Sequence, residues 1–215
     1  MSRGYERKRR QLVERIRSRG IDDPRVLAAL STVPRDAFVP EPIRSRAYDD
    51  TALPIGYGQT ISQPSLQALY LQTLGIGPDD RVLEIGAGSG YQTALLAEVA
   101  GNVYAVERLP ELTQRAREVL DDLGYRNIAL VTKDGTVGWS KYAPYDAILV
   151  AAASPDVPDT LVDQLAPGGR LLIPVGDRIT QDLILIRKTE EGDVERSSVT
   201  QCVFVPLIGR FGWPE

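Results

Sequence analysis

The feature that most constrains the fold is a glycine-rich turn between an apolar segment and a helical one, in VLEIGAGSGYQTA at residues 82–94. Gly86 and Gly88 can adopt positive φ angles and let the backbone approach a ligand closely. A ligand held there lies at the carboxyl end of a strand and at the N-terminus of the following helix. The motif therefore predicts a cofactor site in an α/β sheet.

The segments that follow predict the sheet itself. Strands are predicted at RVLEI, NVYAVE, NIALVT, YDAILVAAA and RLLIPV, and helices at SGYQTALLAEVA, at residues 110–123 and at PDTLVDQLA. Nearly continuous apolar strands separated by helices indicate a doubly wound, mostly parallel α/β sheet that is covered on both faces. The last third predicts two strands joined by a hairpin at Glu191–Gly192, which adds an antiparallel C-terminal edge.

The N-terminal third predicts a helical cap. Leu12 and Ile16 share one face of a helix over residues 5–19, which Gly20 ends. Asp22 or Asp23 can cap a second short helix, and a third is expected over residues 63–74. We therefore expect two units, namely a cap with a segment that gates the site at residues 1–75 and an α/β core at residues 76–215.

Composition excludes several kinds of chemistry. The chain has no histidine and one cysteine, which rules out Ser-His-Asp and Cys-His triads, histidine-ligated zinc and an internal disulfide. We expect no metal site. The net charge of −4 argues against a general nucleic-acid-binding protein, and the sequence contains neither a signal peptide nor an apolar run of membrane-spanning length. We expect a cytoplasmic monomer that binds neither nucleic acid nor membranes.

The spacing of the glycines separates two classes of cofactor. A dinucleotide fingerprint needs a glycine three residues after Gly88, but Tyr91 stands there and Gly90 comes one residue early. Glu84, at the end of the same strand, is unfavourable beside a pyrophosphate. It is favourable beside a cofactor that carries an ammonium and a sulfonium group.

Two further acids end neighbouring strands. Glu107 ends the next strand, 21 residues after Gly86, a spacing that suits hydrogen bonds from ribose hydroxyl groups. Asp134, in the KDG sequence at residues 133–135, follows the third strand and can accept a hydrogen bond from an adenine amino group. Each acid alone can be a solvated loop residue. Three acids at successive strand ends favour a cofactor site.

This arrangement resembles class I S-adenosylmethionine-dependent methyltransferases. The resemblance implies a Rossmann-like methyltransferase sheet with S-adenosylmethionine as the cofactor and S-adenosylhomocysteine as its product. It also implies that Glu84, Gly86, Ala87 and Gly88 line the methionine end of the cofactor. Glu107 is then expected to hold the ribose, with Arg108 beside it, and Asp134 and Gly135 to lie at the adenine.

Four longer segments narrow the family. VPRDAFVP (33–40), GYGQTISQP (56–64), the segment 145–176 and FVPLIGRFGW (204–213) resemble the protein-L-isoaspartate O-methyltransferases over nearly the whole chain. The resemblance implies methyl transfer to the free carboxylate of L-isoaspartyl residues in damaged proteins, which initiates their repair. It implies catalysis by Ser62, cofactor contacts from Gln59, Thr60, Ile61 and Ser62, and substrate contacts from Thr60 and Ser62. The family often has a histidine where this chain has Ser65.

The absence of histidine agrees with this reaction. The substrate carboxyl group has a pKa of roughly 3.5, so it is ionised at neutral pH and needs no general base. Ser62 then has only to donate a hydrogen bond that orients the carboxylate. The alternative is that Ser62 caps the helix that begins near Pro64.

Val205 and Pro206 lie in a predicted edge strand, CVFVPLIG, that can pair with an extended peptide. The alternative there is an ordinary core strand.

Three other functions compete with this interpretation. An NAD-linked oxidoreductase is disfavoured by the position of the third glycine. Methylation of aspartates in biosynthetic peptides is expected to need a peptide-binding extension, and this chain ends at Glu215 without one. Residues 1–20 hold eight Lys or Arg and two Glu and can suggest nucleic-acid binding, but we interpret them as a solvated helix face.

Overall fold

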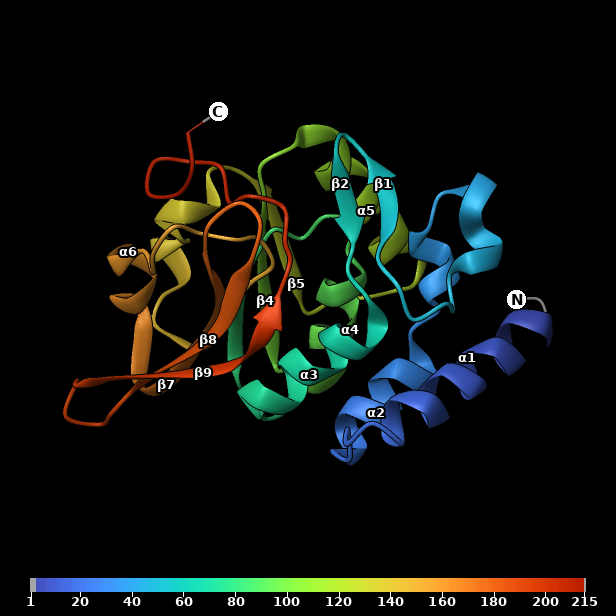
Figure 1. Cartoon of the computed structure of the whole chain (residues 1–215), viewed down its shortest axis with the longest axis horizontal. Helices are drawn as coiled ribbons and strands as arrows, with labels where there is room; N and C mark the ends of the chain where they lie inside the picture. Colours follow the sequence, from blue (N-terminus) through green and yellow to red (C-terminus); the bar gives the residue numbers. More distant parts are fainter. Residues whose placement is uncertain (1–2, 215) are drawn as a thin grey trace.

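The computed structural model describes residues 3–214 of the chain, and within that part a seven-stranded sheet forms the centre of the molecule (Figure 1). Its strands lie in the order β5-β4-β3-β6-β7-β8-β9. Their bounds are β3 Arg81–Ile85, β4 Asn102–Glu107, β5 Ile128–Thr132, β6 Tyr145–Val150, β7 Leu165–Gly176, β8 Gln181–Lys188 and β9 Val194–Cys202. Pairing is parallel from β5 to β7 and antiparallel from β7 to β9, which confirms the predicted sheet with its antiparallel C-terminal edge.

Within the described residues, six helices flank the sheet, and two of them, α2 and α3, show clear capping. They are α1 Arg3–Arg17, α2 Pro24–Thr32, α3 Pro64–Leu74, α4 Tyr91–Val99, α5 Pro110–Asp122 and α6 Asp159–Val162. Asp23, rather than Asp22, is the N-cap of α2, because its carboxylate accepts a hydrogen bond from Arg25 N at 2.8 Å. Gly75 ends α3 with a φ of 56°, a conformation that glycine adopts without steric cost.

Both faces of the sheet are buried at its central strands β3 and β6, as the continuous apolar strands predict, whereas the edge strand β9 is mostly exposed. Val82 belongs to a large cluster with residues of α1 to α5, whereas its neighbour Leu83 belongs to a second cluster with Leu161 of α6. Successive side chains of a strand point to opposite faces, so a strand covered on both sides needs apolar residues throughout. The second face is covered by shorter elements: α6, two 3₁₀ turns at Gly135–Val137 and Ser140–Tyr142, and the C-terminal segment.

The N-terminal helices share the core of the sheet. Leu12 and Ile16 of α1 and Leu30 of α2 belong to the same buried cluster as Leu95 of α4. The predicted helical cap is therefore packed continuously onto the α/β core. The division of the chain at residue 75 stays a prediction.

Two local predictions differ from the structure. The helix expected over PDTLVDQLA is only the four-residue α6, because Leu165 pairs with Tyr145 and already belongs to β7. In the stretch before Gly58, a short antiparallel hairpin was not predicted: β1 Leu53–Gly56 pairs with β2 Gln59–Ile61. Gly56, Tyr57 and Gly58 all have positive φ at this turn, and Tyr57 is a residue type that rarely adopts this geometry.

The strand order creates a crevice beside the glycine-rich turn. The chain runs outward from β3 through β4 to β5, then returns to place β6 on the other side of β3. Open α/β sheets bind ligands outside the carboxyl ends of the strands at such a switch point. In the same described part of the chain, no helix is both long and apolar enough to cross a membrane.

Candidate active site

The glycine-rich turn is held by hydrogen bonds to the neighbouring strand. Gly86 N and Ala87 N both donate to the carbonyl oxygen of Val106, at 2.8 and 3.2 Å. Gly86 and Gly88 have φ angles of 87° and 55°, so side chains at these positions would strain the backbone. The turn therefore brings bare backbone to the end of β3.

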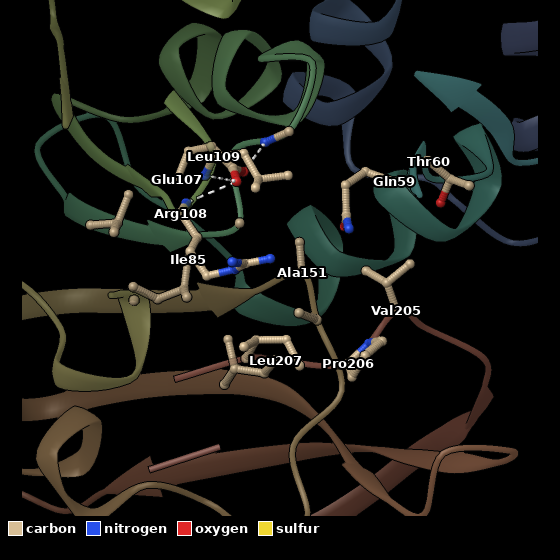
Figure 2. A pocket seen from close by; sticks show the side chains of 16 residues that line it. Gln59, Thr60, Ile85, Glu107, Arg108, Leu109, Ala151, Val205, Pro206 and Leu207 are labelled. Carbon is tan, nitrogen blue, oxygen red and sulfur yellow. Dashed lines mark hydrogen bonds between the residues drawn. The ribbon is translucent and has the colours of Figure 1, made fainter. Parts of the chain in front are cut away.

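Glu107 stands opposite this turn, at the end of β4. One carboxylate oxygen accepts a hydrogen bond from Gly88 N at 2.8 Å, and the other accepts from Arg108 N at 2.8 Å and Leu109 N at 2.9 Å (Figure 2). The side chain is buried, with 7% of its surface exposed. These donors fix the carboxylate in one orientation at the wall of a cavity, where it can accept hydrogen bonds from a ligand.

A first cavity, of about 680 Å³ including its part open to solvent, lies between the turn, Glu107 and the C-terminal segment. Figure 2 shows Glu107 toward one end and Thr60 and Val205 toward the other. Nine residues predicted from the sequence line it: Gln59, Thr60, Gly86, Gly88, Glu107, Arg108, Gly135, Val205 and Pro206. The structure thus brings Glu107, the glycine-rich turn and the segment at residues 59–60 together around the first cavity.

Glu84 lies behind this wall, under α4. Its side chain is fully buried, one carboxyl oxygen accepts a hydrogen bond from Thr93 Oγ1 at 2.6 Å, and the other has no partner among the described residues. Burial raises the pKa of Glu84 to about 8, so the group is mostly neutral at pH 7. A direct contact of Glu84 with a cofactor stays a prediction, as it does for Ala87 and Ile61, which are buried and do not line the first cavity.

Asp134 binds the C-terminal segment. One carboxylate oxygen accepts from Thr136 N and Thr136 Oγ1 at 2.8 and 2.7 Å, and the other accepts from Arg210 N at 2.8 Å. Burial opposes ionisation, but the hydrogen bonds from Arg210 and Thr136 outweigh it and lower the pKa of Asp134. Gly135 lines the first cavity, whereas Asp134 lines an adjoining hollow with Arg108 and Lys133. Its predicted adenine contact is not tested by this placement.

Ser62 lies in a second cavity that adjoins the first at Thr60, which lines both. The Ser62 carbonyl oxygen accepts a hydrogen bond from Arg35 Nη2 at 3.0 Å, but its hydroxyl group has no hydrogen-bond partner within residues 3–214. The alternative that Ser62 caps α3 is wrong. The N-cap is Gln63, and Ser65 N is satisfied by Asp50 Oδ1 at 2.9 Å. The Ser62 hydroxyl is therefore available to a ligand.

The segment that carries Val205 and Pro206 is not an edge strand, and that prediction is wrong. The edge strand of the sheet is β9, which ends at Cys202. Beyond it, Ala153 N donates to Val205 O at 2.8 Å and Leu207 N donates to Ala153 O at 2.7 Å. The segment leaves the β8 ladder to lie beside the end of β6, because Ala153 pairs with the backbone on either side of Pro206, which has no N–H of its own.

Part of the cavity wall was not predicted from the sequence. Ala151 and Ala152, directly after β6, line the first cavity together with Leu207 and Ile208. A Cβ placed on Gly86 would lie 3.7 Å from Ala151, so larger side chains at 151–152 would fill the space in front of the turn. The available indication was a run of three alanines at the end of a strongly apolar strand beside the switch point.

A family comparison identifies this arrangement. The family model for protein-L-isoaspartate (D-aspartate) O-methyltransferase matches residues 7–212 of the chain. The chain belongs to this family.

Individual members of the family are similar along nearly their whole length. A protein-L-isoaspartate O-methyltransferase of Methanoculleus marisnigri is 55% identical over 96% of this chain and 94% of its own. A solved structure of a protein-L-isoaspartate O-methyltransferase has a TM-score of 0.85 and 30% identity, covering 95% of this chain and 67% of its own. A second structure, described as a putative enzyme of this family from Plasmodium falciparum in complex with S-adenosyl-L-homocysteine, has a TM-score of 0.80 and 29% identity over 92% of this chain and 97% of its own. These matches confirm the Rossmann-like methyltransferase sheet.

Proposed function

We propose that this protein transfers a methyl group from S-adenosylmethionine to the free carboxylate of L-isoaspartyl residues in damaged proteins, with Ser62 as the catalytic residue. Family membership over residues 7–212 supports the reaction. The observation that carries the site assignment is the first cavity, where the fixed Glu107 carboxylate faces the bare turn at residues 86–88 and Thr60 leads on to Ser62.

The residues of the first cavity fit the cofactor. Glu107 offers a buried, fixed carboxylate that can accept hydrogen bonds from ribose hydroxyl groups, and Arg108 and Gly135 lie beside it. Gly86 and Gly88 offer close backbone approach at a switch point. At the other end, Gln59 and Thr60 line the same wall. The cofactor, once bound, supplies a methyl group that is activated for transfer by its positively charged sulfur.

The remaining residues have to position a nucleophile. The α-carboxylate of an isoaspartyl residue is ionised at neutral pH, because its pKa is roughly 3.5, so no side chain has to remove a proton. Ser62 can donate its otherwise unused hydroxyl hydrogen bond to one carboxylate oxygen and thereby direct the other oxygen toward the methyl group. Catalysis is then mainly an effect of proximity and orientation.

The substrate has to approach along the second cavity. That cavity is lined by Ser62, Gln63 and Leu66 at the start of α3 and by Val203 and Phe204 of the C-terminal segment. Val205 and Pro206 continue into the first cavity, so an extended peptide would lie with its isoaspartyl carboxylate at the junction near Thr60. After methylation, the peptide nitrogen that follows the isoaspartyl residue attacks the ester carbonyl. Methanol leaves, and a succinimide forms that can hydrolyse to aspartate.

We further propose that the enzyme is a cytoplasmic monomer that acts on isoaspartyl proteins and does not bind nucleic acid. The basic residues of α1 support the last point, because several of them bind the protein itself. Lys8 Nζ, Arg9 Nη1 and Arg15 Nη2 donate to the carbonyl oxygens of Ser45, Thr32 and Tyr48 at 2.9, 3.0 and 2.9 Å. The basic face of α1 thus holds the segment that follows α2.

The deciding experiment measures transfer of a tritiated methyl group from S-adenosylmethionine to two peptides that differ only in isoaspartate or aspartate at one position. We expect methylation of the isoaspartyl peptide alone, in an alkali-labile form because the product is an ester. Glu107→Ala serves as the matched control that keeps the peptide-binding wall and loses a cofactor contact. Equal methylation of both peptides would contradict the proposed substrate.

A further inference from the structure

Arg35, in the 3₁₀ turn Arg35–Phe38, is a buried cation that the proposed mechanism does not use. Its surface is 0% exposed, and the guanidinium donates through all three nitrogens. Nε donates to Ala47 O at 2.8 Å, Nη1 to Gln67 Oε1 at 2.9 Å and Nη2 to Ser62 O at 3.0 Å. Every hydrogen-bond acceptor is a neutral oxygen, and within residues 3–214 no carboxylate forms an ion pair with Arg35.

A buried charge is costly, and here three hydrogen bonds and the nearby charge of Asp50 offset that cost without a direct ion pair. Burial lowers the pKa of Arg35 to about 10, which still leaves the group cationic at neutral pH. The ring of Tyr91 lies under the guanidinium, with its centroid 4.9 Å from Cζ. A planar guanidinium can donate in three directions and stack on a ring at once, which the ammonium group of a lysine cannot do.

The partners of Arg35 belong to the two halves of the proposed site. Tyr91 is the first residue of α4 and directly follows Gly90 of the glycine-rich turn. Ser62, which lines the proposed substrate cavity, lies two residues before the start of α3, and Gln67 lies in the first turn of that helix. One side chain therefore contacts the element that carries the cofactor turn and the backbone carbonyl group of the catalytic residue.

The backbone that follows the Ser62 side chain is held at two places. Arg35 binds its carbonyl oxygen, while Asp50 Oδ1 binds Ser65 N at 2.9 Å three residues later. The Arg35 contact restrains the peptide plane between Ser62 and Gln63, and the Asp50 contact restrains the first turn of α3 that follows it. Because the Ser62 hydroxyl has no partner of its own in the described chain, its position depends on this backbone anchoring.

We propose that Arg35 is a positioning residue for methyl transfer, which holds Ser62 at a fixed place relative to the cofactor turn by binding the Ser62 carbonyl oxygen and the Tyr91 ring together. The proposal rests on the proposed function of Ser62. A misplacement of about 1 Å in a catalytic group can cost about a hundredfold in rate, so loss of this anchor should reduce turnover although Arg35 touches neither cofactor nor substrate.

The first test is a double-mutant cycle on kcat, with Arg35→Met, Ser62→Ala and the double variant assayed below the Tm of all three. Arg35→Met should lower kcat by up to about tenfold in the wild-type background, which is the loss expected for Ser62→Ala itself, and by less than about twofold in the Ser62→Ala background. Affinity for S-adenosylhomocysteine should change by less than about threefold, because the Glu107 wall is untouched. Equal losses of kcat in the two backgrounds would overturn the proposal.

Arg170→Met is the matched control. Arg170 likewise donates to three oxygens, here the backbone carbonyl oxygens of Leu74, Asp146 and Gly75, and it pairs with Asp80, but it lines neither cavity. This variant should lower the Tm and leave kcat at low temperature near the wild-type value. If Arg35→Met does not fold, Arg35→Lys, which keeps the charge and loses the forked geometry, takes its place in the cycle.

A second test does not depend on the substrate. Hydrogen–deuterium exchange in the segment 59–66 should become faster in Arg35→Met than in wild type, and it should remain unchanged in Arg170→Met. Unchanged exchange in Arg35→Met would overturn the positioning role. If the wild-type protein fails to methylate an isoaspartyl peptide, the proposed function fails, and the exchange measurement still decides whether Arg35 holds Ser62 in place.

Discussion

The first cavity and the second cavity meet at Thr60, yet the chain holds them in place in different ways. The Glu107 carboxylate is fixed by the next two backbone N–H groups in the chain and by Gly88 N, 19 residues earlier. Ser62 is held by Arg35, 27 residues away, in an element outside the sheet. The wall of the first cavity that is formed by the glycine-rich turn and Glu107, called here the first wall, is set by parallel strand pairing. The wall of the second cavity that is formed by Ser62, Val203 and Phe204, called the second wall, is assembled from separate segments.

This difference explains why the two walls respond differently to change. Pairing of β3 with β4 places the glycine-rich turn beside Glu107, because parallel strands bring their carboxyl ends to one edge. No comparable ladder links Ser62 to the sheet, and the segment at residues 203–207 is held by one isolated bridge to Ala153 and by side-chain contacts such as Phe204 N to Gln181 Oε1 at 2.8 Å. We expect variants in the first wall to affect cofactor affinity and variants in the second to affect turnover.

The largest effect is expected at Glu107. Glu107→Ala should weaken S-adenosylhomocysteine binding by about ten- to hundredfold, because a hydrogen bond to an ionised acceptor contributes roughly 1.5–3 kcal/mol. Isothermal titration calorimetry on the folded variant measures this loss. Unchanged affinity would show that the first wall does not bind the cofactor through this carboxylate.

Ser62→Ala should have a smaller effect, confined to turnover. We expect kcat to fall by about tenfold with cofactor affinity nearly unchanged, since one hydrogen bond is lost while the second cavity still positions the peptide. Ser62→Thr should retain more activity than Ser62→Cys, because a thiol is a weak donor. Steady-state kinetics and Tm measured on the same three variants separate the catalytic role from a structural one, which would lower the Tm and spare kcat.

Glu84 tests where the first wall ends. Its pKa rises from 4.5 to about 8 on folding, so between these values the folded protein keeps a proton that the unfolded chain has released. The free energy of unfolding should therefore fall as the pH rises through this window, by up to about 1.4 kcal/mol per pH unit, and level off above it. Denaturant titrations of Glu84→Gln should lack this component.

The same variant also tests the predicted contact with the cofactor. Because Glu84 lies behind the wall, Glu84→Gln should bind S-adenosylhomocysteine within about twofold of wild type. A tenfold loss would support direct contact at the methionine end and would extend the first wall to include Glu84.

The smallest expected effect is that of pH on turnover. With saturating isoaspartyl peptide, kcat should be level from about pH 5.5 to about pH 7, because the substrate carboxylate is ionised throughout and no general base has to titrate. A limb in this range would reveal a titrating group in the second wall that the mechanism lacks. A change in kcat close to pH 8 that disappears in Glu84→Gln would instead show that the ionisation of Glu84, behind the first cavity, affects turnover at Ser62.

Local patterns predicted much of the fold. The start of α2 at Pro24, the end of α3 before Gly75 and the five parallel strands follow from capping residues and apolar runs, whose effects act within a few residues. The prediction was wrong where a partner distant in sequence decided the outcome. Leu165 joins β7 rather than a helix because it pairs with Tyr145, and residues 203–207 leave the edge of the sheet because Ala153 binds them.

The sequence by itself determined the α/β sheet, the glycine-rich turn and the acid that ends β4, because periodicity, φ requirements and strand ends are properties of short segments. Only the tertiary structure decided which side chains face the first cavity. It turned Glu84 toward Thr93 and bound Asp134 to the C-terminal segment, and it buried Arg35 against Ser62 and Tyr91. The positions of Asp134 and Arg35 depend on partners that lie far apart in the chain, and that of Glu84 depends on how α4 packs on β3; a sequence pattern does not specify which of these groups will meet.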